Sequence, residues 1–578
     1  MRYSARNPAL SLKLEGWRSR LLLVLVCVGF IGLAARAAYL QGIRHDFLQQ
    51  KGEARYGRVI ELPANRGIVF DRHGEALAIS TPMESVWASP PDANLSDTQL
   101  AKLANILKLE KKEISERLDD KARGFVYLKR QVSPELANAI TALSIPGVFL
   151  RREYKRYYPA GEVMAHVLGF TGIDDTGQEG LELAFQDSLA GLPGAKRVIK
   201  DRAGHIVEDV ESIKLPQDGK PLTLSIDSKI QYLAYRELRD AVKAHRAKAG
   251  SIVVLDVRTG EVVALASLPD YNPNNRIGLK PAQTRNRPVI DMFEPGSTLK
   301  PFTIATALEK GKITPTTVIS TAPGSLVVGN RTIHDAHPQG DLTVAQVIQK
   351  SSNVGSAKIA LSLPAEAMWD MFNDVGFGAS PHSGLPGEAS GKVRPFKSWR
   401  PIEQATMSYG HGISVSLLQL ARAYVVFASG GEIRPITLLK SEAAVEGERV
   451  ISERTARAVT AMLEMAVQPG GTAPKAQVPG YRVAGKTGTA HKQVGARYAS
   501  DVYVSSFVGF APVSAPRFVI AVMIDEPSAG QYYGGAVAAP VFSKVMGDAL
   551  RSQGVVPDAP LKEWSDPMFS APEVKEEA

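Results

Sequence analysis

The longest apolar stretch of the chain lies close to its N-terminus. Residues 21–35 are all apolar or glycine, and after Arg36 the apolar character continues to residue 40. A stretch of about 20 such residues crosses a bilayer as one helix, so we expect a transmembrane anchor at 21–40. Basic residues in the tail 1–20 place that tail in the cytoplasm and the rest of the chain outside. The alternative is a cleaved signal peptide, because the uninterrupted core has only 15 residues and small residues follow it.

Residues 41–217 are polar and mixed, with short runs of both strand-like and helix-like hydrophobic spacing. Residues 66–78 predict a strand, a turn and a second strand. Residues 101–118 carry apolar side chains at helical spacing. Residues 151–182 are dense in glycine, aromatic and charged side chains but contain no catalytic signature. We therefore expect a mixed α/β scaffold domain here rather than a catalytic one.

The region 218–556 begins with a helix and two strands. Asp227 is the expected N-cap of an amphipathic helix, because apolar residues recur after it at helical spacing. Residues 251–257 and 261–267 are β-rich, and the Arg-Thr-Gly sequence between them is typical of a hairpin turn.

A mostly helical stretch to about residue 465 separates these two strands from three more, at 482–490, 502–512 and 518–525. Two strands, many helices and three strands indicate one antiparallel five-stranded sheet, flanked by helices, to which both ends of the domain contribute. The expected fold class is therefore α+β. The tail 557–578 is rich in proline and charge, and we expect it to be disordered.

Composition narrows the possible functions. With 578 residues, of which 44% are hydrophobic and 22% charged, the chain is of ordinary globular type with room for two or three domains. The net charge of +9 is spread along the chain without the basic block typical of nucleic-acid binding, so we expect no nucleic-acid partner. The single cysteine, Cys27, excludes an intrachain disulfide and a cysteine-built metal site.

Ser297 and Lys300 form the one S-x-x-K pattern in the sequence. Three residues make nearly one helical turn, so both side chains project from the same face. Pro301 fits only in the first turn of a helix, which predicts a helix beginning near Ser297. The positive end of the helix dipole would stabilise an alkoxide, and an unprotonated lysine could take the hydroxyl proton. The pattern predicts a nucleophile and its base; a buried helix with a surface lysine is the plainer alternative.

Two further short patterns lie downstream. Ser351-Ser352-Asn353 has the form S-x-N, and Lys486-Thr487-Gly488 has the form K-T-G, followed by Thr489. By itself the first could be a loop or a helix cap, and the second a turn. Their order after S-x-x-K, with the K-T-G on a predicted strand, is typical of β-lactamases and penicillin-binding proteins.

Longer segments around these patterns resemble class B penicillin-binding proteins. The matching segments are FEPGSTLKP, KSSNVG, SYGHGISVSLLQLARAY, VAGKTGTAHK and YYGGAVAAPVF. The anchor, the R-G-x-x-x-D-R-x-G segment and the Y-P-A-G segment are similar to the N-terminal part of that class. The resemblance implies a dimerisation-type pedestal domain at 41–217 and a transpeptidase domain at 218–556, and it is greatest for the division-specific branch. His411 is a departure, because this class often has another aromatic residue there.

The resemblance implies a peptidoglycan D,D-transpeptidase that cross-links stem peptides at the division septum. It implies β-lactams as covalent inhibitors and neither a cofactor nor a metal. Ser297 would attack the D-Ala–D-Ala carbonyl, with Lys300 as the base for acylation. Ser351 would relay a proton to the leaving group, and Asn353 would hold the substrate amide.

The same resemblance implies that the K-T-G strand binds the substrate carboxylate. Lys486 would supply positive charge, and Thr487, Gly488 and Thr489 would line the binding site. The backbone N–H groups of Ser297 and Thr489 would form the oxyanion hole.

The resemblance also places the protein in the inner membrane, with the catalytic domain in the periplasm. Divisome proteins, including a SEDS-type glycosyltransferase, are the implied partners. Three alternatives share the motifs: an elongation-specific class B transpeptidase, a β-lactam-sensing receptor and a β-lactamase, although the last needs neither an anchor nor a large pedestal. A Ser-His-Asp hydrolase and a zinc peptidase are disfavoured because G-x-S-x-G and H-E-x-x-H are absent from the sequence.

Overall fold

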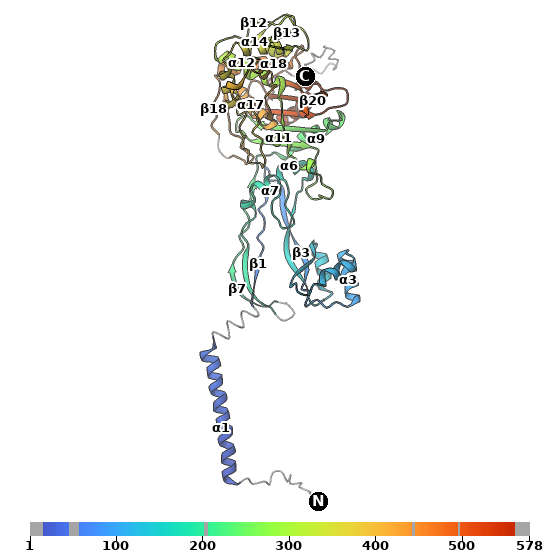
Figure 1. Ribbon diagram of the computed structural model, residues 1–578, viewed down its shortest axis with the longest axis vertical. Helices are drawn as coiled ribbons and strands as arrows, with labels where there is room; N and C mark the ends of the chain where they lie inside the picture. The colour runs from blue at the N-terminus through green and yellow to red at the C-terminus, as the bar shows by residue number, and fades with distance from the viewer. Residues whose placement is uncertain (1–14, 46–56, 201–205, 442–444, 495–496, 561–578) are drawn as a thin grey trace. The chain divides into compact units, whose positions relative to one another are not determined.

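The three-dimensional structure is a computed structural model of the chain, which forms two compact units (Figure 1). The residues that it describes are 15–45, 57–200, 206–441, 445–494 and 497–560. The predicted cytoplasmic tail up to residue 14 and the predicted disordered tail from residue 561 lie outside the described residues.

Among the described residues, one helix is long and apolar enough to cross a membrane. Helix α1 (Gly16–Ala38) continues into a π-helical turn, η2 (Tyr39–Ile43). The segment Gly16–Gly42 contains a window with a mean hydropathy of 2.4, and its side chains are largely exposed. An apolar helix that is not buried in protein suits a lipid environment. The predicted anchor is confirmed as a helix, which begins at Gly16, before the predicted start of the span.

The first unit comprises residues up to 64, 83–153 and 192–217. It contains an antiparallel sheet in the order β1–β6–β7, and three helices that share a hydrophobic core with β3 and β4. Its elements are β1 (Gly57–Leu62), β3 (Ala76–Ala88, in part), α3 (Asp97–Leu107), α4 (Lys111–Leu118), β4 (Val126–Val132), α5 (Pro134–Thr141), β5 (Val148–Tyr157, in part), β6 (Gly194–Lys200) and β7 (Ile206–Lys214). The helix predicted at 101–118 is two helices, because Lys108 takes a left-handed conformation at φ +53° and ends α3.

The second unit comprises residues 65–82, 154–191 and 218 onwards. Two stretches of the predicted pedestal therefore belong to the same unit as the predicted transpeptidase domain. β2 (Val69–Phe70) pairs antiparallel with the start of β3 and parallel with β8 (Leu222–Thr223). This pairing confirms the strand, turn and strand predicted at 66–78.

The centre of the second unit is a five-stranded antiparallel sheet in the order β10–β9–β21–β20–β19. Its strands are β9 (Ala249–Asp256), β10 (Val262–Leu268), β19 (Ala484–Val494), β20 (Arg497–Ala511) and β21 (Phe518–Asp525). Two strands from the start of the domain thus pair with three from its end, as the sequence predicts. Both faces are buried: Ile252 and Val254 face one core, and Val253 and Leu255 face the other.

Helices cover both faces of this sheet. α9 (Ser228–Ala244) and α20 (Ala539–Ser552) pack in one core, and α12 (Lys300–Glu309) and α17 (Leu417–Ala428) in the other. Asp227 caps α9 as predicted, since its carboxylate accepts hydrogen bonds from the N–H groups of Lys229 and Ile230 at 3.0 and 3.1 Å. The remaining elements are η3 (Gly161–Met164), α6 (Ala165–Leu168), α7 (Gly180–Ala184), α8 (Gln186–Leu189), α10 (Pro281–Thr284), α11 (Arg287–Ile290), β11 (Met292–Phe293), η4 (Gly296–Leu299), β12 (Val318–Ser320), β13 (Ser325–Val328), β14 (Arg331–His334), β15 (Asp341–Thr343), α13 (Val344–Lys350), α14 (Asn353–Leu361), α15 (Ala365–Asp374), η5 (Phe396–Ser398), α16 (Pro401–Met407), β16 (Val415–Ser416), β17 (Glu432–Ile433), β18 (Glu448–Arg449), α18 (Glu453–Val467), η6 (Pro474–Ala476) and α19 (Gly534–Val537).

Candidate active site

Ser297 and Lys300 lie at the junction of η4 and α12, where the S-x-x-K pattern predicts a helix start. The helical backbone begins at Gly296, and Pro301 stands in the first turn of α12, where its missing N–H would have had no intrahelical partner. Lys300 Nζ donates a hydrogen bond of 2.8 Å to Ser297 Oγ. Lys300 is fully buried and Ser297 is 6% exposed, so this is not an ordinary helix with a surface lysine.

Ser351 completes a triangle of hydrogen bonds with these two side chains. Its Oγ donates to Ser297 Oγ at 3.0 Å, and its Oγ and carbonyl oxygen accept from Lys300 Nζ at 3.0 and 2.5 Å. Ser351 ends α13 in the left-handed conformation, with φ +61°, which is uncommon for a residue other than glycine. Both of its oxygens meet Lys300 in this conformation, so the strained backbone belongs to the geometry of the site.

Ser352 and Asn353 begin the next helix. Ser352 Oγ accepts a hydrogen bond from the Gly355 N–H at 2.9 Å and donates one to the Asp335 carboxylate at 2.7 Å. The helix-cap interpretation of the S-x-N pattern is therefore correct for Ser352. Asn353 Nδ2 donates to the His334 carbonyl at 3.1 Å, and the role of Asn353 toward substrate stays a prediction.

The K-T-G pattern lies on β19, the edge strand of the five-stranded sheet. Lys486 is fully buried, and its Nζ donates to Thr487 Oγ1 at 3.1 Å and to Thr472 Oγ1 at 3.5 Å. The hydroxyls of Thr472 and Thr487 are themselves 3.0 Å apart. Sequence reasoning missed Thr472, because it lies in a loop before the strand and belongs to no motif.

Glycines bring β19 close to the start of η4. A Cβ atom on Gly488 would lie 2.7 Å from the carbonyl oxygen of Pro295, so a larger residue has no space at the last position of K-T-G. Gly296 has φ +56°, and a Cβ atom there would lie 3.4 Å from the carbonyl oxygen of Thr489. The first and third patterns are therefore packed together, with the Thr489 backbone next to the residue that precedes Ser297.

Glu294, His411 and Tyr498 form a second polar cluster near the nucleophile. The Glu294 carboxylate accepts hydrogen bonds from the Gly412 N–H at 2.8 Å and from the Tyr498 hydroxyl at 3.0 Å, and it lies 3.8 Å from His411 Nδ1. Burial, with the charge of Lys300 adding to it, lowers the pKa of His411 to about 4. Burial raises the pKa of Glu294. Of these three residues, only His411 was singled out from the sequence, as a departure from the usual residue of the class.

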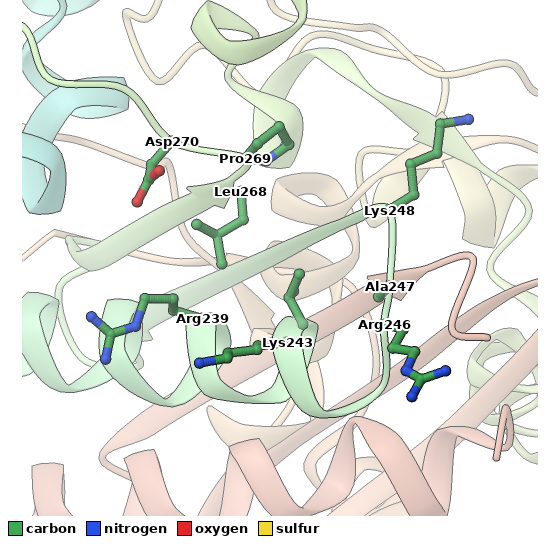
Figure 2. Close-up of a pocket in the computed structure, with 9 residues that line it drawn as sticks. Arg239, Lys243, Arg246, Ala247, Lys248, Leu268, Pro269 and Asp270 are labelled. Carbon is green, nitrogen blue, oxygen red and sulfur yellow. The ribbon is translucent and has the colours of Figure 1, made fainter. Parts of the chain in front are cut away.

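Two cavities differ in their relation to the catalytic patterns. The first, of about 430 Å³, is lined by Arg285, Asp291, Met292, Phe293, Glu294, Ser414, Ala490, His491, Lys492, Gln493, Val504, Met523 and Asp525. The second, of about 490 Å³, lies at the ends of α9 and β10, with Arg239, Lys243, Arg246, Lys248 and Asp270 among its lining residues (Figure 2). Of these two, only the first is lined by residues close in sequence to both patterns: Glu294 lies three residues before Ser297, and Ala490 follows Thr489. We call it the Glu294 cavity.

Comparison with known proteins identifies the family of this chain. Residues 250–547 match the penicillin-binding protein transpeptidase domain, and residues 61–224 match the penicillin-binding protein dimerisation domain. The chain therefore belongs to the class B penicillin-binding proteins, the transpeptidases that carry both domains.

Particular relatives cover almost the whole chain. It is 45% identical to a probable peptidoglycan D,D-transpeptidase, PenA, of Neisseria meningitidis, over 94% of each chain. It is 43% identical to the peptidoglycan D,D-transpeptidase FtsI of Escherichia coli K12, over 94% of this chain and 93% of the relative. The solved transpeptidase domain of Burkholderia pseudomallei penicillin-binding protein 3 is 50% identical, with a TM-score of 0.55, over 58% of this chain and 98% of that one.

Proposed function

We propose that this protein is a serine D,D-transpeptidase that cross-links peptidoglycan stem peptides during septum formation. The observation that carries the proposal is the triangle of buried Ser297 and Lys300 with half-buried Ser351, beside an edge strand that bears Lys486. Relatives that are 43–45% identical over nearly the full chain carry the name peptidoglycan D,D-transpeptidase.

In the acylation step, Ser297 Oγ attacks the carbonyl carbon of the penultimate D-alanine of the donor stem peptide. A neutral Lys300, whose Nζ is 2.8 Å away, takes the hydroxyl proton as the new C–O bond forms. Ser351 Oγ lies 3.0 Å from both Ser297 Oγ and Lys300 Nζ, so it can pass a proton to the departing D-alanine nitrogen. The products are an ester on Ser297 and free D-alanine.

In the second step, an amine of a neighbouring stem peptide attacks the ester carbonyl. A C–N bond forms and the ester C–O bond breaks, and a proton from the acceptor amine returns to Ser297 Oγ through Lys300. The same 2.8 Å contact therefore serves both steps in opposite directions.

The remaining predicted site residues take supporting roles in this proposal. Lys486, with Thr487 and Thr489, binds the donor carboxylate, and the absence of a side chain at Gly488 lets the strand approach η4. Asn353 holds the donor amide. The backbone N–H groups of Ser297 and Thr489 stabilise the oxyanion, a contribution of about 3 kcal/mol per donor in comparable enzymes. The close approach of Thr489 to Gly296 supports this pairing.

Labelling with penicillin tests the proposal. Intact mass should show one adduct per chain, and peptide mapping should place it on Ser297. The same protein should join two synthetic stem peptides with release of D-alanine. An adduct on a different residue, or acylation without any peptide joining, would contradict the transpeptidase proposal, and the second outcome would favour a β-lactam-sensing receptor.

We also propose the chain's topology and partners. The anchor at 21–40 crosses the inner membrane once with the N-terminus in the cytoplasm, and the pedestal (41–217), transpeptidase domain (218–556) and tail (557–578) lie in the periplasm. The apolar helix α1 and the domain matches at 61–224 and 250–547 support this division. Partners in the divisome, including a SEDS-type glycosyltransferase, would dock on the anchored protein.

Removal of the anchor tests this topology. An exported chain that begins near Gly42 should still bind penicillin, because the nucleophile lies in a separate unit. It should fail to support division, since tethering confines the enzyme to the layer in which its substrate is made. A fluorescent fusion of the full chain should collect at the septum. Normal septation with the untethered chain would show that the first 40 residues serve only for export.

A further inference from the structure

Glu294 is a carboxylate at the edge of the active site that neither catalytic step requires. It stands three residues before Ser297 and lines the Glu294 cavity, whose volume is about 430 Å³. Its side chain is 14% exposed, so the carboxylate is shielded but reaches the cavity surface. Ala490 and His491, which follow Thr489 on β19, line the same cavity. A group bound there would lie next to both the nucleophile's helix and the K-T-G strand.

The two cations that line this cavity are already in ion pairs. Arg285 contacts Asp291, and Lys492 Nζ lies 2.7 Å from the Asp525 carboxylate. Lys492 Nζ also lies 2.8 Å from Glu526. These groups therefore balance one another and leave no surplus positive charge directed at Glu294.

The described partners of Glu294 are different in kind. The Gly412 N–H and the Tyr498 hydroxyl are neutral donors. His411, 3.8 Å away, has a pKa lowered to about 4 and is neutral at pH 7. Among the described side chains, no lysine or arginine forms an ion pair with Glu294. A partly buried carboxylate without a cationic partner favours a cationic ligand, because the ligand's charge offsets the loss of hydration.

We propose that Glu294 binds a primary ammonium group of the stem peptide in the Glu294 cavity. The inference rests on the proposed function, which supplies the chemistry: each cross-link consumes an amine, so stem peptides of the matching type carry a residue with a side-chain amine. Such a residue is present on both the donor and the acceptor strand. Glu294 therefore selects for a diamino acid in the stem peptide. The ammonium group belongs either to the donor strand or to the acceptor strand, and the two arms of the experiment distinguish these sources.

Glu294→Gln is the discriminating variant. The amide oxygen of glutamine can still accept the hydrogen bonds from Gly412 and Tyr498. These two hydrogen bonds are therefore kept, and only the negative charge is lost. Tyr498→Phe is the matched control, because it removes the hydrogen bond from the Tyr498 hydroxyl and keeps the negative charge of Glu294. Glu294→Asp, which retains a shorter carboxylate, serves if the glutamine variant fails to fold.

The donor arm compares two thioester donors with the full-length protein in detergent. One is Nα-acetyl-L-lysyl-D-alanyl-D-thiolactate, and the other has its side-chain amine acetylated. Thiol release measures acylation. If the ammonium belongs to the donor, Glu294→Gln should lower kcat/KM for the free-amine donor about tenfold and leave the acetylated donor within about twofold. Tyr498→Phe should leave the preference for the free amine intact.

The acceptor arm uses the acetylated donor with D-alanine as the added amine, which would bind Glu294 as an ammonium ion and release one proton to solvent before it attacks the ester. If the ammonium belongs to the acceptor, Glu294→Gln should lower the ratio of aminolysis to hydrolysis about tenfold and leave thiol release unchanged. Penicillin labelling of Ser297 should be unaffected in either case.

Three outcomes would overturn the inference. One is an unchanged donor preference together with an unchanged aminolysis ratio. Another is an equal loss of activity with both donors and with penicillin, which would mean that Glu294 only holds Gly412 and Tyr498 in place through hydrogen bonds. The third is a Tyr498→Phe variant that shows the same selective loss. If wild-type Ser297 is not acylated at all, the proposed function fails instead.

Discussion

Two polar clusters in the second unit differ in the charges that they contain. In the active site, Lys300 Nζ contacts the hydroxyls of Ser297 and Ser351 at 2.8 and 3.0 Å. In the other cluster, the Glu182 carboxylate lies 2.6 Å from Arg66 Nε and 2.7 Å from Arg156 Nε, with all three side chains at most 1% exposed. The first set of contacts positions an amine among groups that can exchange protons. The second set places one carboxylate between two guanidinium groups, so a single negative charge is shared by two positive ones.

The chemical groups in each cluster determine whether it supports catalysis or stability. Serine hydroxyls both donate and accept, so a proton can move within the triangle without leaving a buried charge unpaired. A guanidinium does not lose its proton in proteins, so the Arg66–Glu182–Arg156 cluster cannot take part in such transfers. Changes in the first cluster should therefore abolish activity with a small effect on folding, and changes in the second should do the reverse.

The largest effect is expected from Ser297→Ala. The nucleophilic oxygen is removed, so penicillin acylation and peptide joining should fall by at least about 1,000-fold. The change removes one buried hydroxyl and should shift the free energy of unfolding by no more than about 1 kcal/mol. Mass spectrometry of the penicillin-treated variant and a denaturant titration measure the two quantities. Full labelling of the variant would show that another residue is the nucleophile.

Lys300→Ala should have the next largest effect. Without the amine 2.8 Å from Ser297 Oγ, the hydroxyl keeps its proton, and acylation should fall by about 100- to 10,000-fold. Lys486→Ala should instead weaken capture of the carboxylate, which raises the penicillin concentration needed for acylation. The rate of acylation at saturating and at low penicillin separates the two variants. A wild-type rate for Lys300→Ala would rule out this lysine as the base.

Glu182→Gln should destabilise the protein by about 3–5 kcal/mol, because two buried guanidinium groups lose their shared counter-charge. The molecules that remain folded should acylate at the wild-type rate, since no catalytic contact changes. The control is Glu453→Gln, which removes an exposed pair with Arg457 and should cost about 0.5 kcal/mol or less. Chemical denaturation, followed by penicillin labelling of the folded fraction, tests both. Equal losses of stability in the two variants would contradict the expected difference between the buried and the exposed ion pair.

The smallest effect concerns Asp175, beside the arginine cluster. Burial raises its pKa from 3.8 to about 6, against the opposing influence of Arg66 and Arg156. An acid whose folded-state pKa is raised stabilises the fold in its protonated form, so this stabilisation is present below about pH 4 and is lost as the pH rises through 6. Asp175→Asn imitates the protonated form and should gain at most about 3 kcal/mol of stability at pH 7.

The measurement for Asp175 is the free energy of unfolding as a function of pH. The gain of the asparagine variant over wild type should appear between about pH 4 and 6 and stay constant above that range. Asparagine tolerates the left-handed backbone of this residue, whose φ is +56°, so strain should not mask the effect. A difference that does not vary with pH would show that Asp175 does not titrate in this range.

Features that depend on near neighbours along the chain could be predicted from the sequence. Pro301 could stand only in a first turn, which located the start of the helix at the nucleophile, and Asp227 could be recognised as a helix cap. Apolar runs of the right length predicted the anchor and the strands of the central sheet. One prediction was too coarse: residues 101–118 form two helices, because Lys108 turns the chain where the hydrophobic spacing continues.

Which distant groups share the site depends on how the elements pack. Ser351 meets Lys300 across 51 residues only because its backbone turns left-handed at the end of α13, and no local pattern marks that turn. Tyr498 forms its hydrogen bond with Glu294 across 204 residues. The hydrophobic pattern of one segment carries no information about the other, so this contact could not be predicted. Sequence patterns report the period and length of elements, which are local properties, whereas contacts across the sheet depend on how the elements pack. The residues of the triangle could therefore be predicted from two motifs, S-x-x-K and S-x-N, and from the family resemblance. Thr472 and the Glu294 cavity could be found only in the folded chain.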